Sequence, residues 1–580
     1  MLSKSNSFTV SSAIATFFHR RGIRFVHQLS GGMIVFLADA FENVGINVIN
    51  YRHEQAAGFS AEGESRFSGN PAIVMGTSGP GATNLITAMA SAYFDSTPVI
   101  FITGQVNTKE LKKNEGQRQN GFQELDIAML CTSITKRVFK LMDVEDLEGT
   151  LTAAWEVSIS DRMGPVLIDI PIDVQQLDVS KELENRISNF QIPQADSNGS
   201  LLLSEPNNAS KTFNLFSEIA RILNSARRPL ILAGGGVRLD LATEDLRDFA
   251  RRSGIPVVSS LMGIDSHSHE EPTYVGFIGS YGNRWANRSL YRSDVLLVLG
   301  SRLDIRQTGD DVHEFASNKF IVRVDVDEHE LSGRVGANIS IDSGIRRFLQ
   351  ELKSFEINPP SASDFLSEIE QWRRENPPSR EQLVLKGVDP ILAVKEIGRC
   401  HKEVAGYMVD VGQHQMWAAQ GLSLSDKQRF ITSGGLGSMG FALPASLGAA
   451  LASGQRWVVI TGDGCIQLSL AELQTLKQLN LPIVIYLFNN FQHGMVAQFQ
   501  KENLERRYLG TRDGYSVPDF KRVVEAFDIS FHRAKNLEEL IEINRGLQNS
   551  IQEPSFVEII IDQEYEALPK LGKQVKLGNM

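Results

Sequence analysis

The stretch that decides the fold runs from Val458-Val459-Ile460 through Gly462-Asp463-Gly464 to the apolar run 483–487 and Asn489-Asn490. Two β-branched runs each end in polar residues, as strands of a parallel sheet do when they lead into site-forming loops. Asp and Asn oxygens at the carboxyl ends of neighbouring strands suit a hard cation such as Mg²⁺, which can neutralise a diphosphate. A lone Gly-Asp-Gly is usually a plain turn, but its pairing with Asn-Asn at this interval is far more specific.

The same alternation recurs along the whole chain and predicts an α/β fold. Further runs of this kind lie at 72–75, 99–103, 166–170, 230–233, 295–299, 320–324 and 556–560. A chain of 580 residues is too long for one core, because cores stop growing near ~250–300 residues. Polar, proline-containing segments at 191–208 and 358–381 indicate two linkers.

We therefore predict three domains, each a doubly wound parallel sheet. Their expected ranges are 1–180, 211–355 and 386–565, with linkers at 181–210 and 356–385 and a tail at 566–580 that is expected either to be mobile or to fold over the site as a lid. The middle domain is expected to be Rossmann-like.

Composition excludes several classes of partner. The formal net charge is −11 and no basic cluster is present, which argues against nucleic acid. No stretch approaches the ~20 apolar residues of a membrane span, and the first residues lack an apolar signal core, so a cytoplasmic location is expected. Cys131, Cys400 and Cys465 are too widely spaced for a thiolate metal site.

Gly-Asp-Gly followed at this interval by Asn-Asn resembles the metal and diphosphate signature of thiamine diphosphate (ThDP) enzymes. The rest of the chain is similar to the catalytic subunits of the acetolactate (acetohydroxyacid) synthase family. The resemblance implies that Asp463, Asn490 and the main-chain oxygen of Gln492 bind Mg²⁺. It also implies that Met439 bends the cofactor. The ThDP residues it assigns to this last block are Val411, Gly412, Gln413, His414, Gly437, Met439, Gly462, Asp463, Gly464, Asn490, Gln492, Gly494 and Met495.

The first block supplies the carboxylate in Arg52-His53-Glu54. A Glu at a helix start is usually a solvated or capping residue, but here it precedes the glycine-rich motif at 77–84. By resemblance, Glu54 is the catalytic acid on the pyrimidine ring, and Gly79, Pro80, Gly81 and Asn84 bind the same end of ThDP. The family joins these halves between subunits, which implies a homodimer or homotetramer.

Three more residues are expected near the reacting carbon. Phe122 would form an apolar wall with Gln123 as its polar partner, and Lys136 matches a family segment in the same region. Without the resemblance, Phe122 is as well explained as a core residue.

The middle block resembles the flavin domain of this family. The residues assigned to FAD are Arg162, Gly234, Gly235, Gly236, Leu261, Met262, Arg302, Asp304, Arg306, Asp325 and Asp342. FAD would be structural, since carboligation exchanges no electrons overall. The sequence departs from the family pattern at Ile305, where an acid is usual.

The segment expected to form the acceptor pocket also differs from the family's usual sequence. The family usually has Gly-Met-Val-Met-Gln-Trp where this chain has Ala497 and Phe499, so a wider pocket is expected, with Arg306 holding the acceptor carboxylate.

These features predict a ThDP-dependent carboligase that decarboxylates pyruvate and transfers the two-carbon unit to a second 2-oxo acid, giving acetolactate or acetohydroxybutyrate. The resemblance implies a place in branched-chain amino acid biosynthesis and a regulatory subunit. Three alternatives stay open: another acceptor such as a keto-sugar nucleotide, a pyruvate decarboxylase or oxidase, and a non-catalytic homologue.

Overall fold

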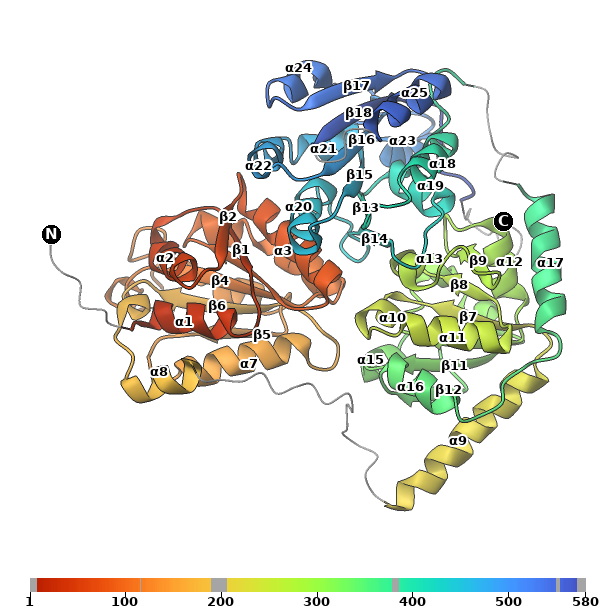
Figure 1. Ribbon diagram of the computed structural model, residues 1–580, viewed down its shortest axis with the longest axis horizontal. Helices are drawn as coiled ribbons and strands as arrows, with labels where there is room; N and C mark the ends of the chain where they lie inside the picture. Colours follow the sequence, from red (N-terminus) through yellow and green to blue (C-terminus); the bar gives the residue numbers. More distant parts are fainter. Residues whose placement is uncertain (1–7, 115, 189–205, 378–384, 549–552, 571–580) are drawn as a thin grey trace.

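The computed structural model describes residues 8–114, 116–188, 206–377, 385–548 and 553–570. Within these ranges the chain forms three six-stranded sheets in which every strand pairing is parallel, with helices on both faces (Figure 1). The predicted α/β class with three doubly wound sheets is therefore confirmed.

The first sheet has the order β2-β1-β3-β4-β6-β5. Its strands are β1 Phe25–Gln28, β2 Asn47–Asn50, β3 Ala72–Gly76, β4 Val99–Gln105, β5 Arg137–Lys140 and β6 Val166–Pro171. Its helices are α1 Val10–His19, α2 Val35–Asn43, α3 Glu54–Ser68, α4 Pro80–Thr83, α5 Ile86–Phe94, α6 Ile127–Cys131, α7 Leu147–Ile159 and α8 Lys181–Ser188.

The second sheet has the order β12-β11-β10-β7-β8-β9. Its strands are β7 Pro229–Ala233, β8 Val257–Ser259, β9 Tyr274–Phe277, β10 Val295–Leu299, β11 Phe320–Asp325 and β12 Ile339–Asp342. Its helices are α9 Pro206–Ser225, α10 Gly235–Leu239, α11 Thr243–Ser253, α12 Arg284–Arg292, α13 Ile305–Thr308, α14 Val312–Ala316, α15 Glu328–Leu331, α16 Ile345–Leu352 and α17 Ala362–Glu375.

The third sheet has the order β14-β13-β15-β16-β18-β17. Its strands are β13 Gly406–Val409, β14 Arg429–Thr432, β15 Trp457–Gly462, β16 Ile483–Asn489, β17 Ser530–Ala534 and β18 Ser555–Ile560. Its helices are α18 Pro390–Cys400, α19 Gln413–Gly421, α20 Ala442–Ser453, α21 Asp463–Gln467, α22 Glu472–Leu479, α23 Gly494–Asn503, α24 Phe520–Glu525 and α25 Leu537–Leu547.

Each sheet has an inner switch point at which successive connections run to opposite sides, and the glycine-rich motifs follow the strands at these points. The switch points lie between β1 and β3, between β7 and β10, and between β13 and β15. Loops diverge there at the carboxyl ends of the strands and leave a crevice in which α/β proteins bind ligands. The topology therefore places all three glycine-rich motifs where ligand sites are expected.

The first and third domains share one hydrophobic core through α3 and α20, which lie against each other in Figure 1. The contact requires glycine, because a Cβ at Gly63 would lie 2.0 Å from the Ala445 carbonyl oxygen and one at Gly448 would lie 1.9 Å from that of Ser60. Phe59 and Phe441 pack edge to face with ring centroids 5.3 Å apart. The two domains are thus fixed relative to each other within one chain.

Two helices lie inside the ranges that were expected to be linkers. Helix α17 buries Phe365, Ile369 and Trp372 in the core of the middle domain, and α8 buries Leu183 and Ile187 in that of the first. The polar composition of these segments reflects the exposed faces of amphipathic helices. Residues 189–205, 378–384 and 571–580, and with them most of the expected lid, lie outside the described residues. Across the described residues, no helix has the length and apolar character that a membrane crossing requires.

Candidate functional site

Asp463 lies at the carboxyl end of β15 and begins α21. Its carboxylate accepts hydrogen bonds from the main-chain N–H groups of Gly464 (3.0 Å) and Gln492 (3.2 Å). Burial raises the pKa of this carboxyl to about 7, despite the two N–H donors that lower it. A bound cation would favour the ionised form, so the site is suited to a metal ion.

Asn490 and Gln492 follow β16 beside it. Asn490 donates from Nδ2 to Gln413 Oε1 (3.0 Å), which leaves its Oδ1 available as a ligand. The main-chain oxygen of Gln492 accepts from Gly494 N–H (2.9 Å) and keeps a second lone pair. The Gln492 N–H donates to Asp463, and Asn490 is only two residues from Gln492, so the structure brings the three expected Mg²⁺ ligands close together. The part of the chain that the structure describes contains no cluster of three or more His, Cys, Asp and Glu side chains able to hold a metal ion. The expected ligands here are instead one carboxylate, one amide oxygen and one main-chain oxygen, which are donors of the kind that Mg²⁺ accepts.

The expected diphosphate loop lies next to this group, at the switch point. The His414 ring packs against two glycines, and a Cβ at Gly412 or Gly462 would come within 2.7 or 2.8 Å of it. His414 is buried, its Nε2 has no hydrogen-bond partner among the described residues, and burial lowers its pKa to about 3. A neutral ring with an orphaned nitrogen between close backbone loops fits a bound ligand.

Met439 lies in the glycine-rich loop that leads into α20. Its Cε is 3.3 Å from the position that a Cβ would take at Gly464, and both Gly437 and Gly440 have positive φ. Asp410, which follows β13, accepts from the N–H groups of Gly440 and Val411, each at 3.0 Å. Asp410 was not predicted, although an Asp directly after a buried strand at a switch point is a signal that could have found it.

A second unpredicted carboxylate holds the other end of this loop from the first domain. Asp95 accepts from the N–H groups of Gly434 (3.1 Å) and Gly435 (2.7 Å). Arg66 lies 3.4 Å from Asp95 and also donates to the Thr432 carbonyl (2.7 Å). These contacts join residues far apart in the sequence, so no local pattern could have indicated them.

Glu54 begins α3 at the carboxyl edge of the first sheet and is buried. Its Oε2 accepts from Asn84 Nδ2 (2.9 Å), and a Cβ at Gly81 would lie 3.5 Å from its Oε1. Gly79 has φ +60° and Pro80 takes the first helical position of α4. The structure therefore gathers the expected pyrimidine-side residues around Glu54.

Phe122 and Gln123 lie in the loop that follows β4, on the same edge. A Cβ at Gly79 would lie 2.9 Å from the Gln123 side chain, so this loop touches the glycine-rich turn. Phe122 is 82% exposed, and Gln123 has a φ of +66°, a strained value for a residue with a side chain. Glu124 holds the loop by accepting from Lys112 N–H (2.7 Å), a role that the sequence did not predict.

Lys136 is not brought to this edge. It precedes β5, and its Nζ donates to the Ser160 carbonyl (2.7 Å) at the end of α7. Because the strands are parallel, Lys136 lies at the amino edge of the sheet and Glu54 at the carboxyl edge. Within one chain, Lys136 therefore does not lie with Glu54, contrary to the expectation from the sequence.

A cleft with about 1360 Å³ of empty space, part of it open to solvent, lies at the switch point of the middle sheet. Its lining includes nine of the residues expected to bind FAD: Arg162, Gly235, Gly236, Leu261, Met262, Arg302, Asp304, Arg306 and Asp325. Two others lie outside the lining. A Cβ at Gly234 would lie 2.0 Å from the Gly300 carbonyl oxygen, so this glycine serves backbone packing, and Asp342 ends β12.

Several of these residues are already engaged by protein groups. Arg162 forms ion pairs of 2.9 Å with Asp327 and Glu330, which join the first domain to the middle one. Asp304 caps α13 by accepting from Arg306 N–H (2.8 Å).

The expected acceptor residues divide between surface and interior. Phe499 is 56% exposed on α23, whereas Ala497 is 1% exposed on the opposite face of the helix. The Ser280 N–H donates to the Arg306 carbonyl (2.7 Å), and the neighbouring Tyr281 hydroxyl contacts Met495 Sδ (3.3 Å). This loop therefore connects the Arg306 turn to α23.

Comparison with known families identifies the class. The N-terminal TPP binding domain of thiamine pyrophosphate enzymes matches residues 8–130, the central domain matches 216–352 and the C-terminal TPP binding domain matches 410–559. Fold, switch-point motifs and family matches agree on a thiamine pyrophosphate enzyme.

Individual relatives narrow the class further. The acetolactate synthase large subunit of Buchnera aphidicola subsp. Acyrthosiphon pisum is 34% identical, covering 97% of this chain and 95% of that protein. The probable acetolactate synthase large subunit of Methanocaldococcus jannaschii is 33% identical, covering 98% and 94%. Acetolactate synthase 1, chloroplastic, of Oryza sativa subsp. japonica is 33% identical, covering 90% and 79%. The chain belongs to the acetolactate synthase family of thiamine pyrophosphate enzymes.

Proposed function

We propose that this chain is a ThDP-dependent carboligase that decarboxylates pyruvate and transfers the two-carbon unit to a second 2-oxo acid. Two pyruvates would give one acetolactate and one CO₂, so the overall change needs no oxidant. The observation that carries the proposal is the buried group of Asp463, Asn490 and Gln492 at the switch point of the third sheet.

Each half of the site has a defined task. Asp463, Asn490 and the Gln492 carbonyl would hold Mg²⁺ against the diphosphate, with the 411–414 loop beside it. Glu54, oriented by Asn84, would share a proton with a ring nitrogen at the other end of the cofactor. ThDP supplies the electron sink for decarboxylation when it is bound. Phe122 would exclude water from the reacting carbon, which favours loss of a charged carboxylate.

The complete site is proposed to form between two copies of this chain. Phe122, in the loop that touches the Gly79 turn, and Phe499 on α23 are both large apolar side chains exposed in one chain, at 82% and 56%. Exposed aromatic residues next to a polar site are typical of protein interfaces. A homodimer that apposes the first domain of one copy to the third domain of the other would cover both. Relatives named large subunits support a further, regulatory partner.

FAD is proposed as a structural cofactor in the middle-domain cleft. The cleft is large, lies at a switch point, and carries Arg302 and Arg306, which would attract phosphates. Its other lining includes the acid Asp325, which would suit hydroxyl groups rather than phosphates. Retention of flavin absorbance by the purified protein after desalting tests this part.

Product analysis tests the reaction. Purified protein with ThDP, Mg²⁺ and labelled pyruvate should form acetolactate, and added 2-oxobutyrate should give acetohydroxybutyrate. Acetaldehyde, peroxide or acetyl phosphate as the main product would instead indicate a decarboxylase or an oxidase. CO₂ release that depends on added carbonyl compounds other than pyruvate and 2-oxobutyrate would indicate another acceptor, an alternative that the departures from the family pattern at Ala497 and Phe499 favour.

A further inference from the structure

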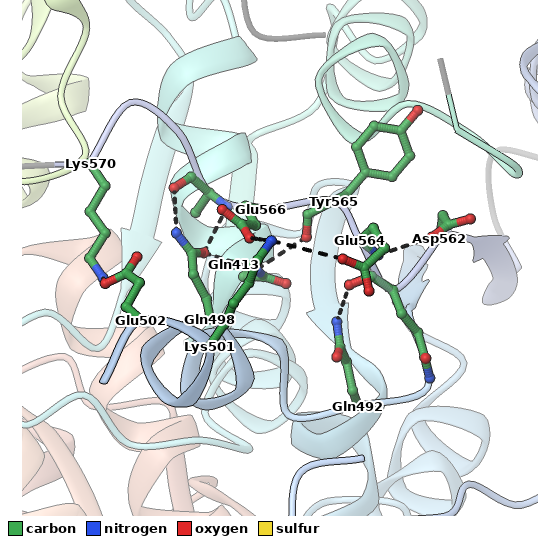
Figure 2. Close-up of polar contacts among 12 residues, drawn as sticks. Gln413, Gln492, Gln498, Lys501, Glu502, Asp562, Glu564, Tyr565, Glu566 and Lys570 are labelled. Atoms are coloured by element: carbon green, nitrogen blue, oxygen red, sulfur yellow. Dashed lines mark hydrogen bonds and ion pairs between the residues drawn. The ribbon is translucent and has the colours of Figure 1, made fainter. Parts of the chain in front are cut away.

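The last described residues of the chain, 562–570, run along α23 and are called here the C-terminal strap. Figure 2 shows side chains of α23 reaching this strap at several points. Lys501 pairs with Glu566 and Glu502 pairs with Lys570. The Trp417 indole also donates to the Glu566 carbonyl (3.1 Å). Ionic contacts alone would fix the strap only weakly, because exposed pairs contribute little.

A chain of three buried side-chain amides leads from the strap into the metal site. Gln498 donates from Nε2 to the Ala567 carbonyl (3.2 Å) and accepts at Oε1 from Ala567 N–H (3.0 Å). Gln413 donates from Nε2 to Gln498 Oε1 (3.1 Å). Asn490 donates from Nδ2 to Gln413 Oε1 (3.0 Å). All three amides are at most 6% exposed, so water does not compete for these bonds.

The main chain of the strap sets the orientation of all three side-chain amides. Ala567 presents one N–H and one C=O, so Gln498 fits with its oxygen toward the N–H and its nitrogen toward the C=O. Gln413 must then turn Nε2 toward Gln498, where it also donates to the Tyr565 carbonyl (3.3 Å). Its Oε1 is left for Asn490 Nδ2, and Asn490 Oδ1 is left for the cation. An amide turned by 180° would instead present Nδ2, which cannot bind a metal ion.

Two further features support this arrangement: a glycine that leaves space for it and a second hydrogen bond to the strap. A Cβ at Gly494 would lie 2.0 Å from Gln413 Oε1 and 2.6 Å from Asn490 Nδ2, so only glycine lets this hydrogen bond pass. The strap also holds a second expected ligand directly, because Gln492 Nε2 donates to the Gln563 carbonyl (2.7 Å).

We propose that Gln498 is a positioning residue that transmits the hydrogen-bond polarity of the C-terminal strap through Gln413 to Asn490, and so keeps the Asn490 oxygen facing the cation. The inference rests on the proposed Mg²⁺ site. It assigns the side chain of Gln413 to this relay, while its main chain remains in the diphosphate loop. Loss of such an outer-shell partner typically lowers metal affinity by ~10–100-fold.

The test measures Mn²⁺ affinity by calorimetry, or by the electron paramagnetic resonance signal of free Mn²⁺, in full-length protein saturated with ThDP. Gln498→Leu keeps the volume but removes the polarity, and it should weaken Mn²⁺ binding by about 10-fold. The same substitution is then made in Asn490→Asp protein. A carboxylate offers an oxygen in either orientation, so Gln498→Leu should change the affinity of that protein by less than about twofold.

Glu502→Gln is the matched control, because Glu502 lies on the same helix and contacts the strap outside the amide chain. It should leave Mn²⁺ affinity within about twofold of wild type. If Gln498→Leu lowered Mn²⁺ affinity equally in wild-type and Asn490→Asp protein, α23 would have loosened in general and the proposal would be overturned. Unchanged Mn²⁺ affinity in both proteins would also overturn it. Failure of wild-type protein to bind Mn²⁺ with ThDP would overturn the proposed function instead, so the two failures are distinguishable.

Discussion

The two halves of the candidate site differ in how complete each is within a single chain. In the third domain, Asp463, Asn490 and Gln492 are buried, and main-chain and amide groups fix each of them. In the first domain, Glu54 is fixed by Asn84, but the adjoining loop carries an exposed Phe122 and a strained Gln123. The proposed cation half of the site, in the third domain, is thus held within one chain, whereas the proposed base half, around Glu54, is open on one side.

This difference indicates a division of labour. A cation site tolerates little misplacement, because its ligands must present oxygens at fixed positions. A wall that excludes water is useful only when it closes, so it can be completed by another surface. We therefore expect changes in the third domain to alter cation affinity, and changes in the first domain to alter turnover without altering cation affinity.

Glu54→Gln should have the largest effect. The amide cannot exchange a proton with the ring nitrogen, so acetolactate formation should fall by roughly a hundredfold to ten-thousandfold. Mn²⁺ affinity, measured with ThDP present, should stay within about twofold of wild type because the cation half is separate. Unchanged turnover would remove Glu54 from the reaction and revive the non-catalytic alternative.

Asp463→Asn should show the opposite pattern. The loss of the one carboxylate in the cation group should weaken Mn²⁺ binding by at least about 100-fold, beyond what an outer-shell change usually costs. Saturating Mn²⁺ should restore part of the turnover, which cannot occur in Glu54→Gln. Rescue of both variants by the cation, or of neither, would contradict the separation of the two halves.

Acid should destabilise the third domain through a buried histidine. His401 is buried in the third domain beside the Tyr486 hydroxyl (2.7 Å), and burial lowers its pKa to about 3. A lowered histidine pKa means that the unfolded chain binds the proton more tightly. The stability due to this group is therefore present above the unfolded pKa of about 6.5 and is lost as the pH falls toward 3. At pH ~5 the loss should be about 2 kcal/mol, or roughly 30-fold in the unfolding equilibrium.

Hydrogen exchange of peptides spanning β13 and α18 checks this expectation. Protection should fall between neutral pH and pH ~5 in wild type and fall less in His401→Gln, after correction for the intrinsic exchange rate. Equal losses in both proteins would show that His401 does not carry the acid sensitivity.

What the sequence predicted well were features carried by local patterns. β-branched runs that lead into glycine-rich or polar turns identified the parallel sheets, and Asp463 and Asn490 each follow such a run. The parts it missed depend on contacts between distant segments. Asp95 holds Gly434 and Gly435 across more than three hundred residues, and no local signal indicates such a pair.

Lys136 was misplaced because similarity to a segment does not tell which edge of a parallel sheet that segment reaches. The buried face of Ala497 was likewise beyond prediction, since the direction of a helix face depends on what packs against it.

Phe122→Ala tests the open wall with a smaller expected effect. At 82% exposure the side chain contributes little to the fold of one chain, so unfolding stability should change by less than about 0.5 kcal/mol. Turnover should fall by on the order of tenfold, equivalent to ~1.4 kcal/mol of transition-state stabilisation, while Mn²⁺ affinity stays unchanged. Met129→Ala is the matched control, because Met129 is 81% exposed in the same domain but lies on α6 rather than in the loop that touches the Gly79 turn. Equal losses of turnover in the two variants would mean that exposed apolar surface matters only for general association, and the first domain would then contribute no wall to the site.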